Sequence, residues 1–190
     1  MTQQFPGSEF PSIPGDPLIL EPLQKSLLAM TYGVHIIGST SVKNEHNLMI
    51  ADWVMQVSFQ PRLVAVSIEN DARTLRFIQE TKSFTVNLLH QLDGIDLARA
   101  VVMPSEGKKI KGRSISFSEK VHNKLDGLDH TFAKNGSPIL NNALAWYGCD
   151  VQQLIPAGDH TLVIGEAIEG ALLRSGDALT EKELGWEYGG

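Results

Sequence analysis

The histidines and the single cysteine are the side chains of this 190-residue chain with the widest range of catalytic chemistry. No two histidines stand four residues apart around a glutamate, so the helical zinc site of metalloproteases is absent. One cysteine excludes a multi-thiolate metal site and an intrachain disulfide framework, and we expect no metal. The sequence also has no Gly-x-Ser-x-Gly nucleophile elbow and no glycine-rich phosphate loop. Scattered histidines are most often structural or exposed; here they are His35, His46, His90, His122, His130 and His160.

Cys149 lies in a predicted strand, after Tyr147 and before Val151. This setting favours a buried, inert thiol over a reactive nucleophile.

A second group of candidate residues lies at the start of a predicted helix. Asp71 can cap this helix, and Leu75 and Ile78 then face inward. Arg73 and Thr74 fall in its first turn, where free backbone N–H groups and the positive helix end attract anions. Arg73 can equally be a solvated helix residue.

Strands must position these groups. Apolar and β-branched runs predict five or six of them: Val34–Ser39, Leu63–Ile68, Phe84–Leu89, Ala145–Leu154 and Leu162–Glu169, with Met49–Phe59 as a further candidate. Helical segments are too few and too irregularly placed for a repeating strand-helix-strand sheet. The sequence therefore predicts a mainly β fold with peripheral helices, and a largely antiparallel barrel.

Two further helices and one loop region complete the predicted elements. An apolar stripe of Leu23, Leu27, Leu28 and Met30 predicts a helix from Glu21 that ends near Thr31–Gly33. Asp93 or Asp96 can cap another, with Leu97, Ala98, Val101 and Val102 inward. Ser105–Asp129 is predicted to form surface loops around a short strand at Ile115–Phe117.

The first 22 residues hold five of the nine prolines and several large apolar side chains. We interpret residues 1–22 as an extended arm and 23–190 as a single domain. The arm is too apolar for a freely solvated tail, so we expect it to lie on the domain or on a partner subunit; a disordered leader is the alternative.

Charge and hydropathy exclude two classes of partner. Sixteen Lys and Arg against 22 Asp and Glu give a net charge of −6, without the basic footprint of a nucleic-acid binder. Any anionic ligand must be held by local donors. No apolar run is long enough to cross a membrane, and the N-terminus does not resemble a secretory signal, so we expect a cytoplasmic protein.

One long string remains unusual, from Asn47 to Ile68: NLMIADWVMQVSFQPRLVAVSI. In physical terms a polar turn leads into a strand bearing Trp53, and a Ser-x-x-Pro turn then leads into a buried strand. The simplest interpretation is a hairpin, with Trp53 in the core and Gln56 and Ser58 as polar turn residues.

This string resembles the pattern N-x-M-x-x-x-W-V-x-Q-x-S-x-x-P-x-L-V of the flavin reductase-like FMN-binding domains. Further pieces follow in the family's order: Phe84-Thr85-Val86-Asn87-Leu88-Leu89, Gly136-Ser137-Pro138-Ile139-Leu140 and Gly158-Asp159-His160-Thr161-Leu162. The agreement extends from about Leu27 to Gly176.

The resemblance implies a split β-barrel that forms a homodimer, with FMN in a groove near the subunit interface. It also implies hydride transfer from NADH or NADPH to flavin N5, and an electron acceptor that the sequence does not identify. Asn47 and the backbone of Met49, Ile50, Ala51, Asp52 and Trp53 would line the ring; Gln56, Val57 and Ser58 would reach the ribityl chain and phosphate. Asn70, Arg73 and Thr74 match the phosphate-side turn, and Asn87 would sit beneath the ring or satisfy strand-end backbone groups.

His160 matches the family's Gly-Asp-His triplet, which implies a place near the nicotinamide side of the flavin. There its role would be contact and alignment, because hydride transfer needs closeness more than acid-base help. The alternative is a histidine fixed in a tight turn by Asp159.

Ile50 and Asp52 depart from the family pattern, which commonly has Thr or Ser facing the flavin. A carboxylate at Asp52 that pointed at the flavin would repel the anionic reduced ring and lower its potential. Two other functions stay open: a flavoredoxin-like electron carrier without NAD(P)H activity, and a cofactor-free or haem-binding barrel.

Overall fold

Seven antiparallel strands form the main sheet of the computed structural model, which describes residues 22–102 and 123–184. Their order is β2-β1-β5-β8-β9-β4-β3. The strands are β1 (His35–Thr40), β2 (His46–Ala51), β3 (Val54–Ser58), β4 (Leu63–Glu69), β5 (Ser83–Leu88), β8 (Ala145–Ala157) and β9 (His160–Leu172). Two short strands, β6 (His130–Phe132) and β7 (Pro138–Leu140), form a separate hairpin.

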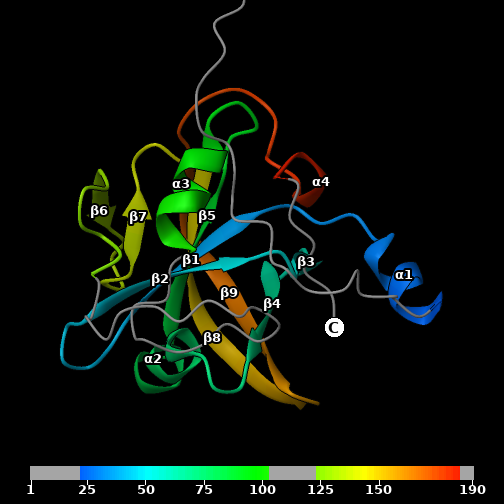
Figure 1. The fold of residues 1–190 in the computed structure, drawn as a ribbon. Helices are drawn as coiled ribbons and strands as arrows, with labels where there is room; N and C mark the ends of the chain where they lie inside the picture. Colours follow the sequence, from blue (N-terminus) through cyan, green and yellow to red (C-terminus); the bar gives the residue numbers. More distant parts are fainter. Residues whose placement is uncertain (1–21, 103–122, 185–190) are drawn as a thin grey trace, which may run out of the picture.

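The sheet curls into a split barrel because its two edge strands are consecutive in the sequence. β2 is one edge and β3 the other, and only Asp52 and Trp53 separate them. β2 also contacts β4, the neighbour of β3, so the edges come close without a shared ladder. Figure 1 shows β1 and β2 crossing over the long β8 and β9 strands. The predicted mainly β fold of split-barrel type is confirmed.

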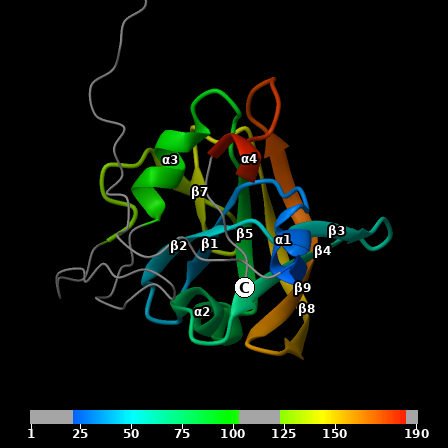
Figure 2. The ribbon, with the colours of Figure 1, turned by 45° about the vertical axis from the view of Figure 1, so that its right-hand side comes forward.

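Within the described ranges, four helices lie outside the barrel: α1 (Pro22–Leu28), α2 (Arg73–Thr81), α3 (Gly94–Val101) and α4 (Glu181–Leu184). In Figure 2, α3 and α4 lie toward one end of the barrel and α2 at the other. Among the described residues no helix is both long and apolar enough to cross a membrane.

Strand alternation divides the core into two layers. Ile37 on β1 and Phe84 and Val86 on β5 belong to the cluster inside the barrel. Ile36, one residue earlier on β1, joins an outer cluster with Leu140 of β7 and residues of α3. The β6–β7 hairpin lies close to β1 because Gly38 has no side chain; a Cβ there would stand 2.5 Å from the Pro138 carbonyl oxygen.

The prediction of one strand over Met49–Phe59 is wrong, since the chain breaks at Asp52 and Trp53 into β2 and β3. The Trp53 N–H donates to Asp52 Oδ1 (2.9 Å) and the Val54 N–H donates to the Asp52 carbonyl (2.8 Å). An aspartate that bonds its own neighbouring backbone favours a turn. This local signal lies inside an otherwise β-like run, without Gly or Pro to mark it.

The prediction that Asp71 caps α2 is also wrong. The N-cap is Ala72, which has no side-chain acceptor, and the helix begins at Arg73. Backbone bonds of Asn70 to Asp159 and of Ala72 to Glu69 hold Asp71 in the turn before the helix. Leu75 and Ile78 are buried as predicted.

At α3, Asp93 does occupy the N-cap position, but its side chain makes no cap bond and pairs with Arg174. Ala98 and Val101 of α3 are buried, as predicted.

Helix α1 forms near the predicted place, yet its apolar stripe is not covered by the described residues. Leu23 is 69% exposed and Leu27 51%. Figure 1 shows α1 standing apart from the barrel. The predicted strand Ile115–Phe117 and nearly all of the predicted arm lie outside the described residues.

Candidate functional site

Asp52 lies in the two-residue turn between β2 and β3, and one oxygen of its carboxyl group is buried. Its Oδ2 has no hydrogen-bond partner among the described residues. Burial is the main cause that raises the pKa of Asp52 to about 6; the Glu181 carboxylate acts in the same direction, while the backbone hydrogen bonds and His160 act against it. Removing a carboxylate from water disfavours its charged form unless a partner compensates. Asp52 therefore carries a proton over a range in which an exposed aspartate is ionised.

Next to Asp52, the Trp53 ring packs on the ring of His160 at the start of β9. The ring centroids are 5.0 Å apart and the planes are inclined by 43°. His160 Nδ1 lies 2.7 Å from Asp159 Oδ1. Because an ionised carboxylate only accepts, Nδ1 is the donor in this contact. Asp159 thus fixes His160 as the tight-turn interpretation requires, and Trp53 gives the imidazole an aromatic neighbour.

Asn70 connects this group to α2. Its side chain donates to the Gly158 carbonyl (3.2 Å) and accepts from the Thr161 hydroxyl (2.8 Å). These bonds tie the β8–β9 turn to the end of β4. Both polar atoms of the Asn70 amide are thereby used within the protein, which leaves little capacity for a ligand.

The first turn of α2 lies beyond Asn70. Buried Asn47 of β2 donates from its amide to the Thr74 hydroxyl (2.7 Å). Arg73 lies 3.8 Å from Glu45 and has its guanidinium over the Phe77 ring. Because Ala72 supplies no acceptor, the α2 cap contributes no competing side-chain oxygen. Backbone N–H groups in such a turn bind anions readily.

Lys124 is a further cation at this end that the sequence did not single out. Burial lowers its pKa to about 8, and the positive charge of Arg73 adds to the lowering. The sequence placed Lys124 in a surface loop, whereas the adjacent Leu125 is buried in the outer core cluster. The sequence did contain one sign that this segment is buried: an apolar residue, Leu125, directly follows the lysine in an otherwise polar stretch.

We refer to these residues together as the β2 wall: Asp52, Trp53 and His160 at one end, Asn70 in the middle, and Asn47, Arg73, Thr74 and Lys124 at the other. Its ends differ in charge. Carboxyl groups of Asp52, Asp159 and Glu181 lie at the first end. The second end has the Arg73 and Lys124 cations, with the single carboxylate of Glu45 beside Arg73.

Along β2 the side chains alternate. Met49 and Ala51 belong to the cluster inside the barrel, whereas Ile50 packs against the outer cluster. Ile50 therefore points away from its neighbours Met49 and Ala51.

Gln56, Val57 and Ser58 do not join this wall. Ser58 pairs with Leu63, the first residue of β4, while Arg73 follows the last residue of that strand. At about 3.3 Å per residue, these positions are roughly 20 Å apart along β4. Within one protomer, Ser58 and Arg73 cannot hold the same phosphate.

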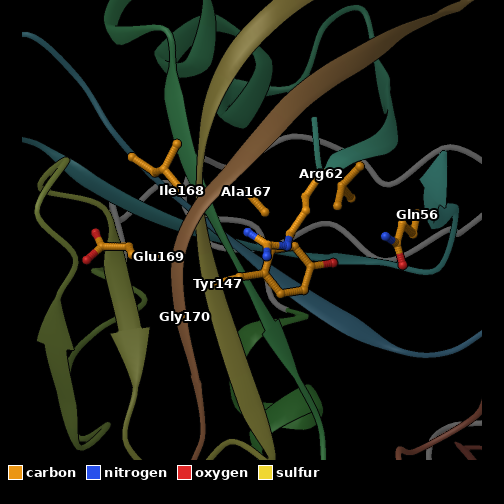
Figure 3. A pocket seen from close by; sticks show the side chains of 8 residues that line it. Gln56, Arg62, Tyr147, Ala167, Ile168, Glu169 and Gly170 are labelled. Atoms are coloured by element: carbon orange, nitrogen blue, oxygen red, sulfur yellow. The ribbon is translucent and has the colours of Figure 1, made fainter. Parts of the chain in front are cut away.

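Gln56 instead lines an open pocket of about 440 Å³ on the other side of β4. The pocket is bounded by Gln56, Arg62, Val64, Tyr147, Ala167, Ile168, Glu169 and Gly170. Figure 3 shows Arg62 extending toward the region of the Tyr147 ring, with Gln56 further along on β3. Met55, 63% exposed, and Val57, 44% exposed, lie on the same strand as Gln56.

Asn87 is fully buried on β5 and its amide serves the backbone. It donates to the Ile36 carbonyl (3.1 Å) and accepts from the Leu140 N–H (2.8 Å). It shares a face with Thr85, toward β7, and not with inward-facing Val86. Of the two roles left open for Asn87, these bonds match the structural one.

We expect Cys149 to be unreactive in the folded protein. Its thiol is buried, and burial raises its pKa to about 12. Only the thiolate attacks electrophiles. At pH 8 a thiol reagent such as 5,5′-dithiobis(2-nitrobenzoate) should modify none of the native protein within minutes, and one thiol per chain in denaturant. Rapid native modification would contradict the buried assignment.

Most of the chain matches one protein-family model. The family model described as "Flavin reductase like domain" matches residues 27–183. This chain belongs to the flavin reductase like domain family. The match covers the whole barrel and both ends of the β2 wall. The family that the sequence resembles is thereby confirmed.

Curated relatives within this family are longer proteins. The chain is 29% identical over 158 residues to a high molecular weight rubredoxin of Moorella thermoacetica, covering 82% of this chain and 62% of that protein. It is 26% identical over 161 residues to a putative diflavin flavoprotein A 2 of Nostoc, covering 83% of this chain and 25% of that protein. The chain thus spans less than two thirds of these relatives.

Among solved structures, the flavin reductase PheA2 in its native state superposes with a TM-score of 0.64 at 26% identity. The superposition covers 83% of this chain and 90% of that one.

Proposed function

We propose that this protein binds FMN along the β2 wall and transfers hydride from NADH or NADPH to flavin N5, passing electrons to an acceptor. The observation that carries the proposal is the charge division of that wall within a flavin reductase like domain. A ligand with a dianionic phosphate at one end and a planar ring at the other fits it in one direction only.

At the phosphate end, Arg73, Lys124 and the first-turn N–H groups of α2 supply the donors. Guanidinium and ammonium groups bind phosphate through charge-assisted hydrogen bonds. Thr74 is already hydrogen-bonded by Asn47, which orients its hydroxyl. The local site thereby overcomes the chain's overall negative charge.

At the ring end, Trp53 supplies apolar contacts for the flavin ring, and the backbone of Met49 to Asp52 supplies polar groups along its edge. FMN, when bound, supplies the capacity to accept two electrons as a hydride. The residues of the chain supply position: Asp159 orients His160, and His160 offers Nε2 and a ring face to the incoming nicotinamide. Closeness and alignment are the main requirements of such a transfer.

The test is the visible spectrum followed by steady-state turnover. The protein incubated with FMN and desalted should keep the flavin absorption bands, and it should oxidise NADH or NADPH faster than free FMN does. A colourless protein after desalting, together with no turnover above background, would refute the proposal.

A second candidate function is an electron carrier that holds FMN without using a nicotinamide nucleotide. The observation that favours it is the length of the curated relatives, in which a rubredoxin or diflavin flavoprotein contains this domain within a larger chain. Bound flavin that is reduced by a partner protein but not by NADH or NADPH would identify the carrier.

We also propose that the protein works as a homodimer. Large apolar side chains are exposed on α1, on β3 and directly after β3: Leu23, Leu27, Met55, Val57 and Phe59. Phe59 is 88% exposed, which is unusual for a side chain of that size in a monomer. Light scattering after size exclusion should give twice the chain mass of 20.8 kDa.

Lys124 makes FMN affinity depend on pH in the alkaline range. Its pKa of about 8 means that the free protein loses this cation as the pH rises through 8, while phosphate binding favours the charged form. We expect the dissociation constant of FMN to rise about tenfold between pH 7 and pH 9. Flavin fluorescence quenching measures it.

Riboflavin, which lacks the phosphate, should show no such change over the same range. The Lys124→Arg variant should bind FMN with a flat profile, because arginine stays charged. A wild-type profile as flat as that of riboflavin would remove Lys124 from the phosphate site.

A further inference from the structure

The half-buried carboxyl group of Asp52 uses only one of its two oxygens in the turn between β2 and β3. Oδ1 accepts the Trp53 N–H at 2.9 Å, but Oδ2 is buried and unpartnered among the described residues. Natural proteins seldom leave a buried polar atom without a partner, because the uncompensated desolvation is costly. Such an atom is expected where the group serves another purpose.

The position of Asp52 links it to the ring end of the β2 wall. Asp52 directly precedes Trp53, whose ring packs on His160. The charges that act on Asp52 are the His160 ring of β9 and the Glu181 carboxylate of α4. His35 of β1 lies beside the preceding residue, with Nδ1 3.3 Å from the Ala51 carbonyl.

We propose that Asp52 makes the redox potential of the bound flavin depend on pH, by carrying its charge beside the ring only when it is deprotonated. This inference rests on the proposed binding of FMN. A flavin gains negative charge when it takes up two electrons and fewer than two protons. An ionised Asp52 opposes that charge, whereas a protonated Asp52 does not.

The direction of the effect follows from the burial of the group. With a pKa near 6, Asp52 is ionised at pH 7.5 and protonated at pH 5. At pH 7.5 it therefore weakens binding of the reduced flavin relative to the oxidised flavin. Deprotonation of Asp52 disfavours reduction, so the potential is lowered at neutral pH and the lowering disappears in acid.

The deciding experiment measures the midpoint potential of FMN bound to the wild-type protein and to Asp52→Asn, from pH 5 to pH 8. At pH 7.5 we expect the variant to bind reduced relative to oxidised FMN about tenfold better, which raises the two-electron potential by about 30 mV. At pH 5 the two proteins should agree. The matched control is Asp150→Asn, an exposed aspartate on β8, which should follow the wild type throughout.

Asp52→Ser provides a second neutral variant if Asp52→Asn does not fold, and should shift the potential in the same direction. Equal potentials in wild type and neutral variants at pH 7.5, or a difference that persists unchanged at pH 5, would overturn the inference while FMN binding stands. Failure of the wild-type protein itself to retain FMN would refute the proposed function, and this inference with it.

Discussion

Replacing both cations at the phosphate end of the β2 wall, in an Arg73→Ala/Lys124→Ala variant, should weaken FMN binding about 100-fold. Two charge-assisted contacts to a dianionic phosphate would be lost, in a place that is partly removed from water and therefore weakly screened. The loss should disappear when riboflavin is the ligand. Isothermal titration or fluorescence quenching with both ligands provides the comparison.

Arg76→Ala is the matched control, because Arg76 also lies on α2 and over the Phe77 ring but one turn from the site. It should leave FMN affinity within about twofold of the wild type. The alternative for Arg73 is a helix residue whose role is structural, through its contacts with Glu45 at 3.8 Å and with the Phe77 ring. Equal FMN affinity of the double variant and the Arg76→Ala control would favour that alternative.

Strands were predictable from the sequence where runs of apolar and β-branched residues coincide with buried segments of the sheet. The strands at His35–Thr40, Leu63–Glu69 and Ser83–Leu88 lie within one residue of the predicted runs at each end. Their β-branched and apolar side chains alternate between two buried layers, which is the pattern that a covered sheet requires.

The break at Asp52 and Trp53 was not predictable from the same pattern. Both halves of the run have strand-like composition, and the turn depends on one aspartate that bonds its own backbone. Since β2 and β3 then pair at opposite sheet edges, this break determines where every later site residue lies.

The candidate site residues were likewise only partly predictable from the sequence. The family resemblance placed Ser58 at the phosphate together with Arg73 and Thr74, but antiparallel pairing puts Ser58 at the far end of β4. Register is set by pairing partners that a single sequence does not display. Lys124 was missed for a related reason: a residue distant in sequence approaches Arg73 only after the chain has folded.

The orientation of Asn87, by contrast, follows from the way side chains alternate between the two faces of a strand. Phe84 and Val86 point into the barrel, so Thr85 and Asn87 must face the other way. That face is covered by β7, and a buried amide there has to bond the neighbouring backbone.

The Asn87→Ala variant should therefore lose about 2–4 kcal/mol of unfolding free energy and keep its flavin affinity. The substitution leaves the Leu140 N–H and the Ile36 carbonyl without their amide partner in a fully buried place, and it opens a small cavity between β1, β5 and β7. Denaturant unfolding of the apoprotein measures the first effect, and FMN titration well below the transition measures the second.

Asn135→Ala is the companion variant, because Asn135 also donates to backbone carbonyls, those of Phe84 and Cys149, from a less buried position. It should destabilise the protein less, by about 1 kcal/mol. If Asn87 instead sat beneath the flavin ring, its removal would lower FMN affinity more than stability, and the order of the two variants in unfolding would no longer follow burial. The bonds of Asn87 to β1 and β7 predict the opposite: a loss of stability with the cofactor site intact.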